Sequence, residues 1–181
     1  MKEEIIIAGF GGQGVLSMGK ILAYSGLMQG QEVSWIPSYG PEQRGGTSNC
    51  TVVISGEMIG SPVVNHPDIL VALNKPSLEE FAVRVKKDGI ILYDTEIGEF
   101  KSPGNIKAIR VPALKIAKEH GVGKAANTAM LGVLMAISTE LSEKVFEDAV
   151  KQAFTKKPKM ISVNLDVLKA GSEWAKRNLN I

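Results

Sequence analysis

The stretch Gly9-Phe10-Gly11-Gly12-Gln13-Gly14 decides the fold of this chain. It follows the apolar run 5–8 and precedes a segment with the apolar spacing of a helix. Such a sequence predicts the first strand-to-helix turn of an α/β domain, where glycines allow a tight turn and close packing of helix on strand. The free N–H groups at the start of that helix could bind an anion or polar group. Alternatively, the glycines serve the turn alone.

The spacing Gly-x-Gly-x-x-Gly also occurs in dinucleotide-binding proteins, but the second predicted strand lacks a residue that such a site needs. An acidic residue about 20 positions after the glycines usually holds the ribose hydroxyls. Here the second strand covers 32–36, Glu32 stands at its start, and Pro37 and Ser38 follow its end. No Gly-Lys-Ser/Thr follows the glycines, which excludes a P-loop. We therefore expect an anion or polar ligand near the glycines rather than ordinary NAD.

Length and composition indicate one soluble domain covering residues 1–181, with 44% hydrophobic and 22% charged residues. The formal charge of +2 is too small to favour nucleic acid as a partner. Cys50 is the single cysteine of the sequence, which excludes an internal disulfide and any iron–sulfur cluster held by this chain alone.

No stretch of the sequence predicts a signal peptide or a membrane span. The longest mostly apolar segment, 129–137, is far below the roughly 20 residues that cross a bilayer. We therefore expect a cytoplasmic protein without membrane partners.

The loop 37–48 is rich in turn formers and also carries Tyr39, Glu42 and Arg44. Loops after the first two strands of an open α/β sheet leave from the carboxyl edge, so this loop should face the glycine turn. Arg44 is the best candidate for binding a phosphate or carboxylate, because its planar fork can donate two parallel hydrogen bonds. The alternative is a surface arginine flanked by glycines for flexibility.

The remaining pattern predicts a three-layer α/β/α fold with a mostly parallel, Rossmann-like sheet and C-terminal helices. Residues 56–59 indicate a turn and a short return strand, which would form an antiparallel edge hairpin. Asn127 should cap an apolar, central helix over 128–140, and Cys50 should be a buried structural thiol. Further strands are expected at 50–55, 68–73, 90–93 and 106–111, and further helices at 15–28, 76–87, 112–120, 142–154 and in a segment reaching Asn178.

The sequence contains no arrangement typical of a catalytic centre. It has no Ser/His/Asp pattern, no closely spaced pair of catalytic carboxylates and no His/Cys cluster with metal-ligand spacing. We therefore predict no catalytic and no metal-binding residues. The candidate ligand-binding residues are Gly11, Gly12, Gln13, Gly14, Tyr39, Glu42, Arg44 and Asn127.

Four segments together resemble the gamma subunit of the 2-oxoacid:ferredoxin oxidoreductases, and the resemblance covers essentially the whole chain. They are Gly9–Val15, Tyr39–Thr47, Ile59–Pro62 and Asn127–Gly132. The resemblance implies a subunit of an enzyme that decarboxylates a 2-oxoacid oxidatively, makes the acyl-coenzyme A and passes electrons to ferredoxin. Thr47–Cys50 and Ile59–Pro62 favour the 2-oxoglutarate type over the pyruvate type.

The resemblance also implies a division of labour between subunits. Thiamine diphosphate and Mg²⁺ belong to the alpha and beta subunits, and iron–sulfur clusters to other subunits such as a ferredoxin-like delta. This chain alone would bind no cofactor and would help to shape the coenzyme A side of the active site. It should be inactive alone and should associate, with partners or as a homo-oligomer, because 15–28 and 128–140 are nearly all apolar. The alternatives are a stand-alone NAD(P) or flavin reductase and a scaffold without a ligand.

Overall fold

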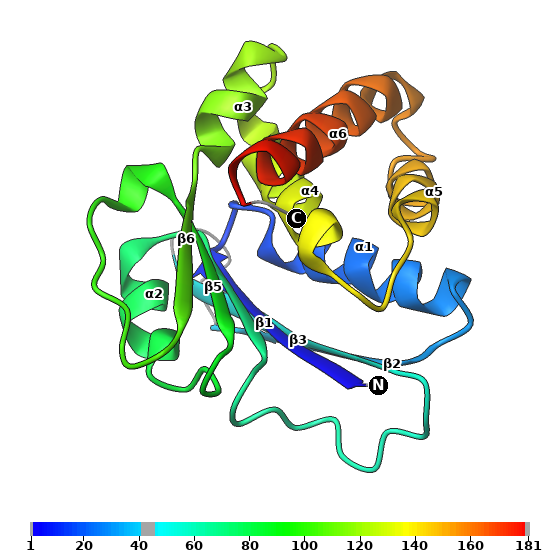
Figure 1. Ribbon diagram of the computed structural model, residues 1–181. Coiled ribbons are helices and arrows are strands. Elements are labelled where there is room, and N and C mark those ends of the chain that lie inside the picture. Colours follow the sequence, from blue (N-terminus) through cyan, green and yellow to red (C-terminus); the bar gives the residue numbers. More distant parts are fainter. Residues whose placement is uncertain (1, 41–45, 180–181) are drawn as a thin grey trace.

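The computed structural model in Figure 1 describes residues 2–40 and 46–179. Within these residues, six strands form one sheet in the order β2-β3-β1-β4-β5-β6. Their bounds are β1 Lys2–Phe10, β2 Glu32–Tyr39, β3 Thr47–Ser55, β4 Ile69–Ala72, β5 Ile90–Asp94 and β6 Lys107–Val111. Strands β1, β4, β5 and β6 pair in parallel, whereas β3 pairs antiparallel with both β1 and β2. Strand β3 therefore runs against the other five described strands.

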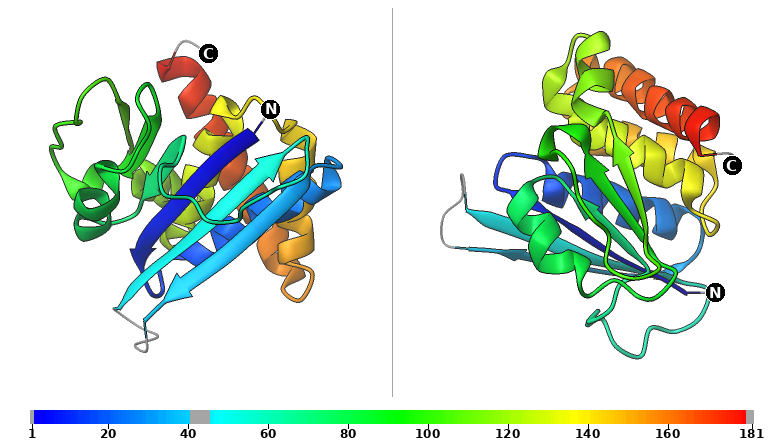
Figure 2. Two further views of the ribbon diagram at one scale, coloured as in Figure 1. Left: turned by 90° about the horizontal axis from the view of Figure 1, so that it is seen from below. Right: turned by 60° about the vertical axis from the view of Figure 1, so that its left-hand side comes forward.

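Helices cover both faces of the sheet, which gives the three layers predicted from the sequence. Helix α2 lies on one face, and the other α-helices of the described chain lie on the opposite face (Figures 1 and 2). The bounds are α1 Val15–Met28, α2 Lys75–Ala82, α3 Ala113–Glu119, α4 Ala126–Ile137, α5 Glu143–Ala153 and α6 Ile161–Asn178. No helix in the described ranges is both long and apolar enough to cross a membrane.

The antiparallel edge exists, but the predicted hairpin at residues 56–59 is wrong. All nine residues of β3 pair with β1 on one side, and eight of them pair with β2 on the other. The antiparallel edge is therefore made of β2 and β3, joined through the loop after Tyr39. Residues 56–68 form no strand and pass over the α2 side of the sheet instead.

Helix α4 is the central helix, and the chain itself covers it. It lies between the sheet and α6 (Figure 1), and every residue of 128–135 is buried. A Cβ on Gly132 would overlap the backbone carbonyl of Leu168, and one on Gly171 would overlap that of Ala129. The two helix backbones are therefore in direct contact. Because α6 covers α4, this helix gives no support to the expectation of an external docking surface.

The predicted cap of α4 is also wrong. The helix begins at Ala126, directly after a short 3-10 helix η2 (Gly123–Ala125), so Asn127 lies in its first turn. The Asn127 side chain reaches the glycine turn instead, where its Nδ2 donates to the carbonyl oxygen of Gly14 at 3.4 Å. No side chain caps α4, and Ala125 of η2 stands at its N-cap position.

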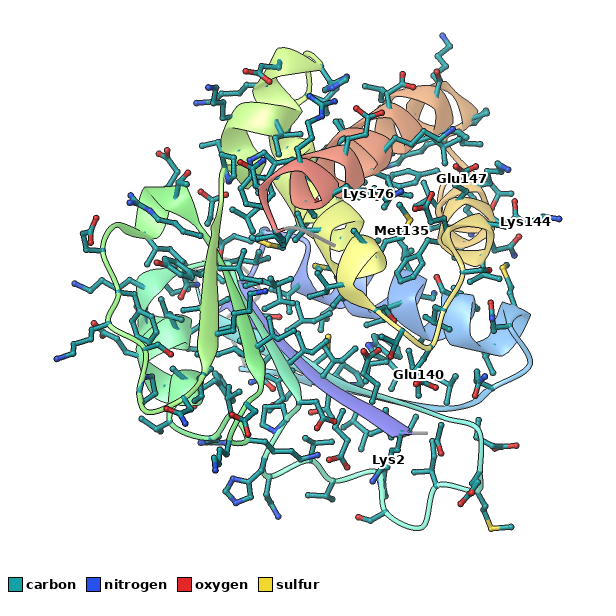
Figure 3. The ribbon with its side chains drawn as sticks, viewed as in Figure 1. Lys2, Met135, Glu140, Lys144, Glu147 and Lys176 are labelled. Atoms are coloured by element: carbon teal, nitrogen blue, oxygen red, sulfur yellow. The ribbon has the colours of Figure 1, made fainter. Side chains whose placement is uncertain are left out.

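Glu3 is a buried acid at the amino edge of the sheet, with 8% of its surface exposed. Ser138, which follows α4, donates its hydroxyl to Glu3 Oε2 at 3.2 Å. Burial raises the pKa of Glu3 to about 7; the Ser138 hydrogen bond opposes this, and the charges of Glu140 and Asp68 add to it. Lys2 and Glu140 mark this end of the molecule in Figure 3. The carboxyl of Glu3 therefore titrates near neutral pH in the folded chain.

Candidate functional site

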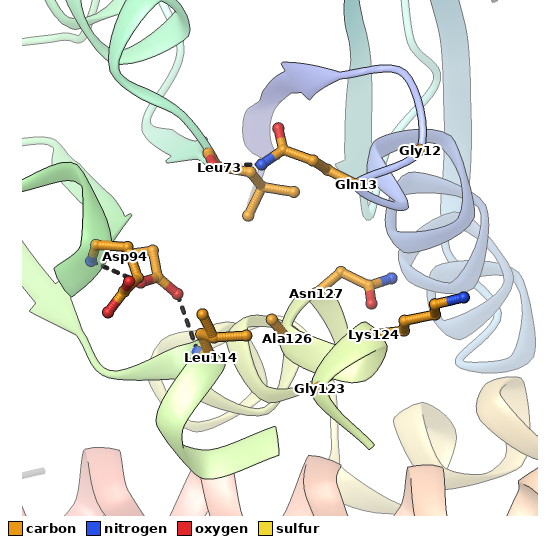
Figure 4. Close-up of a pocket in the computed structure, with 10 residues that line it drawn as sticks. Gly12, Gln13, Leu73, Asp94, Leu114, Gly123, Lys124, Ala126 and Asn127 are labelled. Atoms are coloured by element: carbon orange, nitrogen blue, oxygen red, sulfur yellow. Dashed lines mark hydrogen bonds between the residues drawn. The ribbon is translucent and has the colours of Figure 1, made fainter. Parts of the chain in front are cut away.

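The candidate site lies where the chain changes from one face of the sheet to the other. Helix α1 follows β1 on one face, and α2 follows β4 on the opposite face. Strands β1 and β4 are parallel neighbours. In an open α/β sheet, ligands bind in the crevice outside the carboxyl ends of two such strands. The glycine turn after β1 lies at this crevice (Figure 4).

The glycine turn needs glycine at specific positions. Gly12 and Gly14 have φ values of +98° and +80°, in the left-handed region that favours glycine. A Cβ on Gly14 would also overlap the side-chain amide of Asn127. Gly11 donates its N–H to the carbonyl oxygen of Gly46 at 2.9 Å. This bond confirms the prediction that the loop after β2 reaches the glycine turn, although β3 separates β2 from β1.

The side chain of Gln13 bridges the ends of β1 and β4. Its Oε1 accepts hydrogen bonds from the Phe10 N–H at 2.7 Å and from Asn74 Nδ2 at 3.1 Å, and its Nε2 donates to the Leu73 carbonyl oxygen at 2.8 Å. Asn74 in turn caps α2, because its Oδ1 accepts from the N–H of Ser77 at 2.9 Å. One amide therefore fixes the floor of the crevice between the two strands.

A cavity of about 400 Å³ opens beside this bridge. Its walls come from the glycine turn, the ends of β4 and β5, the first turn of α3, and η2 with α4 (Figure 4). The lining residues are Gly12, Gln13, Leu73, Asp94, Glu96, Leu114, Gly123, Lys124, Ala126 and Asn127. The lining combines amides, two acids and one lysine, which suits a polar organic ligand better than a bare anion.

Asp94 holds one wall of the cavity in place. It is buried at the end of β5, and its Oδ1 accepts from the N–H of Glu96 at 2.8 Å while its Oδ2 accepts from the N–H of Leu114 at 3.0 Å. The carboxylate thus joins β5 to the first turn of α3. Lys124 is exposed and lies on the other side of the cavity from Asp94 (Figure 4).

The structure brings together some of the predicted binding residues. Gly12, Gln13 and Asn127 line the cavity, and Gly11 and Gly14 shape the turn through the contacts given above. Tyr39 ends β2, and its predicted binding role stays a prediction. Glu42 and Arg44 lie outside the described residues, so their predicted roles stay predictions.

The binding residues predicted from the sequence do not include Asp94, Glu96 and Lys124, which also line the cavity. Asp94 and Glu96 follow a strand, which was the available signal. Lys124 lies on η2 and reaches the site only through long-range packing.

Cys50 is a buried structural thiol, as predicted. It is fully buried on β3, and burial raises its pKa to about 12. A Cβ on Gly19 of α1 would overlap its sulfur. The thiol therefore packs against a helix backbone and remains protonated at neutral pH.

We expect Gln13→Glu to lower the melting temperature, because it removes the hydrogen bond from Gln13 to the Leu73 carbonyl oxygen that links β1 to β4. A carboxylate could still accept from Phe10 and Asn74, but it would face the Leu73 carbonyl oxygen without a proton to donate. Gln13 and this hydrogen bond are exposed, so its loss should cost about 0.5–1.5 kcal/mol, which corresponds to a melting temperature lower by roughly 1–6 °C for a chain of this size. The exposed Gln152→Glu on α5 is the control. Equal melting temperatures of the two variants in thermal denaturation would contradict the bridging role.

The chain belongs to the pyruvate ferredoxin/flavodoxin oxidoreductase family, whose sequence model matches residues 4–174. The ketoisovalerate oxidoreductase subunit VorA of Methanothermobacter marburgensis is 60% identical over 177 residues, which cover 97% of this chain and 37% of VorA. The 2-oxoglutarate synthase subunit KorC of the same organism is 38% identical over 181 residues, which cover 96% of each chain. This chain therefore spans little more than a third of the length of VorA and nearly all of KorC.

Solved structures of the same kind share the fold. The gamma subunit of a keto/oxoacid ferredoxin oxidoreductase from Geobacter sulfurreducens has a TM-score of 0.82 and 29% identity, with 97% of this chain and 99% of that chain covered. A 2-oxoglutarate:ferredoxin oxidoreductase from Magnetococcus marinus, solved with 2-oxoglutarate, coenzyme A and succinyl-CoA bound, has a TM-score of 0.87 and 26% identity, with 97% and 31% covered. The resemblance to gamma subunits is confirmed. The preference for the 2-oxoglutarate type is not supported, because the identity to VorA is much higher than that to KorC.

Proposed function

We propose that this chain is the gamma-type part of a 2-oxoacid:ferredoxin oxidoreductase that decarboxylates its substrate oxidatively, forms the acyl-coenzyme A and passes electrons to ferredoxin. One observation carries the proposal: the chain matches separate subunits of such enzymes over almost its whole length. It acts with alpha and beta subunits and a ferredoxin-like delta subunit, and it is inactive alone. The alternative is a stand-alone NAD(P) or flavin reductase.

We propose a branched 2-oxoacid of the ketoisovalerate type as the substrate. The support is the 60% identity to VorA, compared with 38% identity to KorC. The 2-oxoglutarate expected from residues 47–50 and 59–62 remains the competing substrate.

Thiamine diphosphate and Mg²⁺ belong to the alpha and beta subunits in this proposal, and iron–sulfur clusters to other subunits. The described part of this chain holds no group of three or more His, Cys, Asp or Glu side chains that could bind a metal ion.

The cavity would receive part of coenzyme A. Lys124 would pair with a phosphate, and the amides of Gln13 and Asn127 suit the amide groups of the pantetheine arm. Arg44 would supply a second contact, to a phosphate or to a partner carboxylate.

The substrate can be tested by purifying the chain together with the candidate alpha, beta and delta subunits of its organism. The complex is supplied with thiamine diphosphate, Mg²⁺, coenzyme A and oxidised ferredoxin, and kcat/KM is compared for ketoisovalerate, 2-oxoglutarate and pyruvate. We expect a preference for ketoisovalerate of at least about tenfold, the range of discrimination that apolar pockets achieve. A preference for 2-oxoglutarate would refute the substrate and leave the subunit role standing. Absence of acyl-coenzyme A with all three acids would refute the proposed function.

A further inference from the structure

The side chain of Gln13 has one hydrogen-bonding group left for a ligand. Its Oε1 already accepts from the Phe10 N–H at 2.7 Å and from Asn74 Nδ2 at 3.1 Å, which uses both lone pairs of an amide oxygen. Its Nε2 donates one hydrogen to the Leu73 carbonyl oxygen at 2.8 Å (Figure 4), and the second hydrogen has no partner within the described part of the chain. Because Gln13 lines the cavity, it can offer a ligand there one N–H and no acceptor.

Backbone groups at both ends fix the orientation of the Gln13 and Asn74 amides. The Phe10 N–H can only donate and the Leu73 carbonyl oxygen can only accept, so the oxygen and nitrogen of Gln13 cannot exchange places. At the other end, the Ser77 N–H donates to Asn74 Oδ1 at 2.9 Å, so the nitrogen of Asn74 must face Gln13. The direction of these hydrogen bonds is therefore set from the start of α2 to the cavity.

Asn74 holds Gln13 from a buried position. Asn74 is 7% exposed and directly precedes α2, whereas Gln13 is exposed. A Cβ on Gly9 would lie 2.8 Å from Gln13 Oε1, so the first glycine of the turn leaves room for this side chain to fold back onto the strand ends. Because Gln13 itself is exposed, its amide depends on the buried Asn74 for a fixed position.

We propose that Asn74 is a positioning residue of the cavity, which holds the Gln13 N–H toward an acceptor oxygen of coenzyme A. The inference rests on the proposed function, in which the cavity receives part of coenzyme A. A donor that is already held in place loses less conformational freedom when the ligand binds. The acceptor is a carbonyl oxygen of the pantetheine arm, since Lys124 is the cation among the described lining residues and pairs with a phosphate. A phosphate oxygen is the competing acceptor.

Asn74→Asp separates the two contacts of this side chain. The carboxylate still accepts from the Ser77 N–H, because aspartate caps helices as well as asparagine does. It has no hydrogen for Gln13 Oε1 and repels that oxygen, so the Gln13 amide loses its position. Asn74→Ser also keeps a capping oxygen and lacks the amide nitrogen, and it carries the test if the aspartate variant does not fold. Asn178→Asp is the matched control, since Asn178 Nδ2 donates to the Trp174 carbonyl oxygen at 2.8 Å at the exposed end of α6.

The measurements use the complex of this chain with its candidate alpha, beta and delta subunits. We expect Asn74→Asp to raise both the KM for coenzyme A and its Kd in titration calorimetry at least about fivefold, as the loss of one hydrogen bond to a ligand does, and Asn74→Ser to raise them as well. The kcat and the KM for the 2-oxoacid should equal those of Asn178→Asp, whereas a general loss of structure would change them too.

A fragment of coenzyme A identifies the acceptor oxygen. The bisphosphorylated adenosine of coenzyme A, without the pantetheine arm, should inhibit the unsubstituted complex and the Asn74→Asp complex equally. Weaker inhibition of the Asn74→Asp complex would assign the acceptor to a phosphate instead of the pantetheine arm.

A double substitution shows whether Asn74 acts through Gln13. In a Gln13→Ala background the donor is already absent, so adding Asn74→Asp should change the Kd for coenzyme A by less than about twofold. An equal rise of the Kd in both backgrounds would overturn the proposal, and so would unchanged Kd and KM values in both Asn74 variants. If the unsubstituted complex neither binds coenzyme A nor forms acyl-coenzyme A, the proposed function is refuted and this inference with it.

Discussion

Gly171→Ala is expected to lower the free energy of unfolding by about 3 kcal/mol or more, and Gly132→Ala by a similar amount. Alanine normally stabilises a helix by up to about 1 kcal/mol relative to glycine, so the expected sign is opposite to the intrinsic preference. The reason is the contact between α4 and α6, where each new methyl group would overlap a backbone carbonyl of the other helix. A backbone carbonyl cannot turn aside as a side chain can, so the two helices must separate.

Separation of α4 and α6 would also disturb a buried polar contact. Thr128 donates its hydroxyl to Asn164 Oδ1 at 2.9 Å, and Asn164 Nδ2 donates to the Met160 carbonyl oxygen at 2.8 Å. Urea denaturation of each variant measures the loss. Gly60→Ala, in a loop position where a Cβ would meet no atom within 4 Å, is the control and should stay within about 0.5 kcal/mol of the unsubstituted chain. If Gly171→Ala matched Gly60→Ala in stability, the close helix contact would be refuted.

Glu3→Gln is expected to stabilise the chain at pH 8 by about 3 kcal/mol and to have little effect at pH 4. Burial raises the pKa of Glu3 from 4.5 to about 7. The folded chain therefore binds this proton more tightly than the unfolded chain does. As pH rises from 4.5 to 7, the unfolded state releases the proton first and stability falls. Above pH 7 the Glu3 carboxyl is charged in both the folded and the unfolded chain, and the folded chain bears the full free-energy cost of the buried carboxylate.

Glutamine keeps the size of the side chain and an oxygen that accepts from the Ser138 hydroxyl, but it carries no charge. The free energy of unfolding of the variant should therefore fall less between pH 4.5 and 7, by about 3 kcal/mol. The measurement is the free energy of unfolding in urea at several pH values from 4 to 8. Glu57→Gln, on an exposed loop, is the control. Parallel pH profiles of the Glu3 variant and the unsubstituted chain would rule out titration of Glu3 near neutral pH.

The order of elements could be predicted from the sequence because it depends on local patterns. The run 5–8 with its glycine turn gave β1 and α1, and Pro76 and Gly89 bounded a β-α-β unit around α2. Strand pairing could not be predicted in the same way. The apolar sequence of β3 does not show which strands lie beside it. The prediction therefore assigned the antiparallel edge to a hairpin at 56–59, whereas the structure forms it from β2 and β3.

The part of the candidate site that depends on local sequence could be predicted, and the part that depends on distant segments could not. The glycine spacing identified Gly12 and Gln13, since a strand-to-helix turn fixes its own geometry. The bridge from Gln13 to Leu73 and the place of Lys124 depend on segments about 60 and 110 residues away, as the separations in the sequence show. The sequence predicts Asn127 both as a binding residue and as a helix cap; in the structure it lines the cavity but does not cap α4.

We propose that this chain is a required subunit of a 2-oxoacid oxidoreductase. The most direct test measures acyl-coenzyme A formation by the purified candidate partner subunits, with and without this chain, using ketoisovalerate, coenzyme A and ferredoxin. We predict no product from this chain alone, little from the partner subunits alone, and full activity when they are combined. Equal product formation with and without the chain, or reduction of NAD(P) or flavin by the chain alone, would contradict the claim.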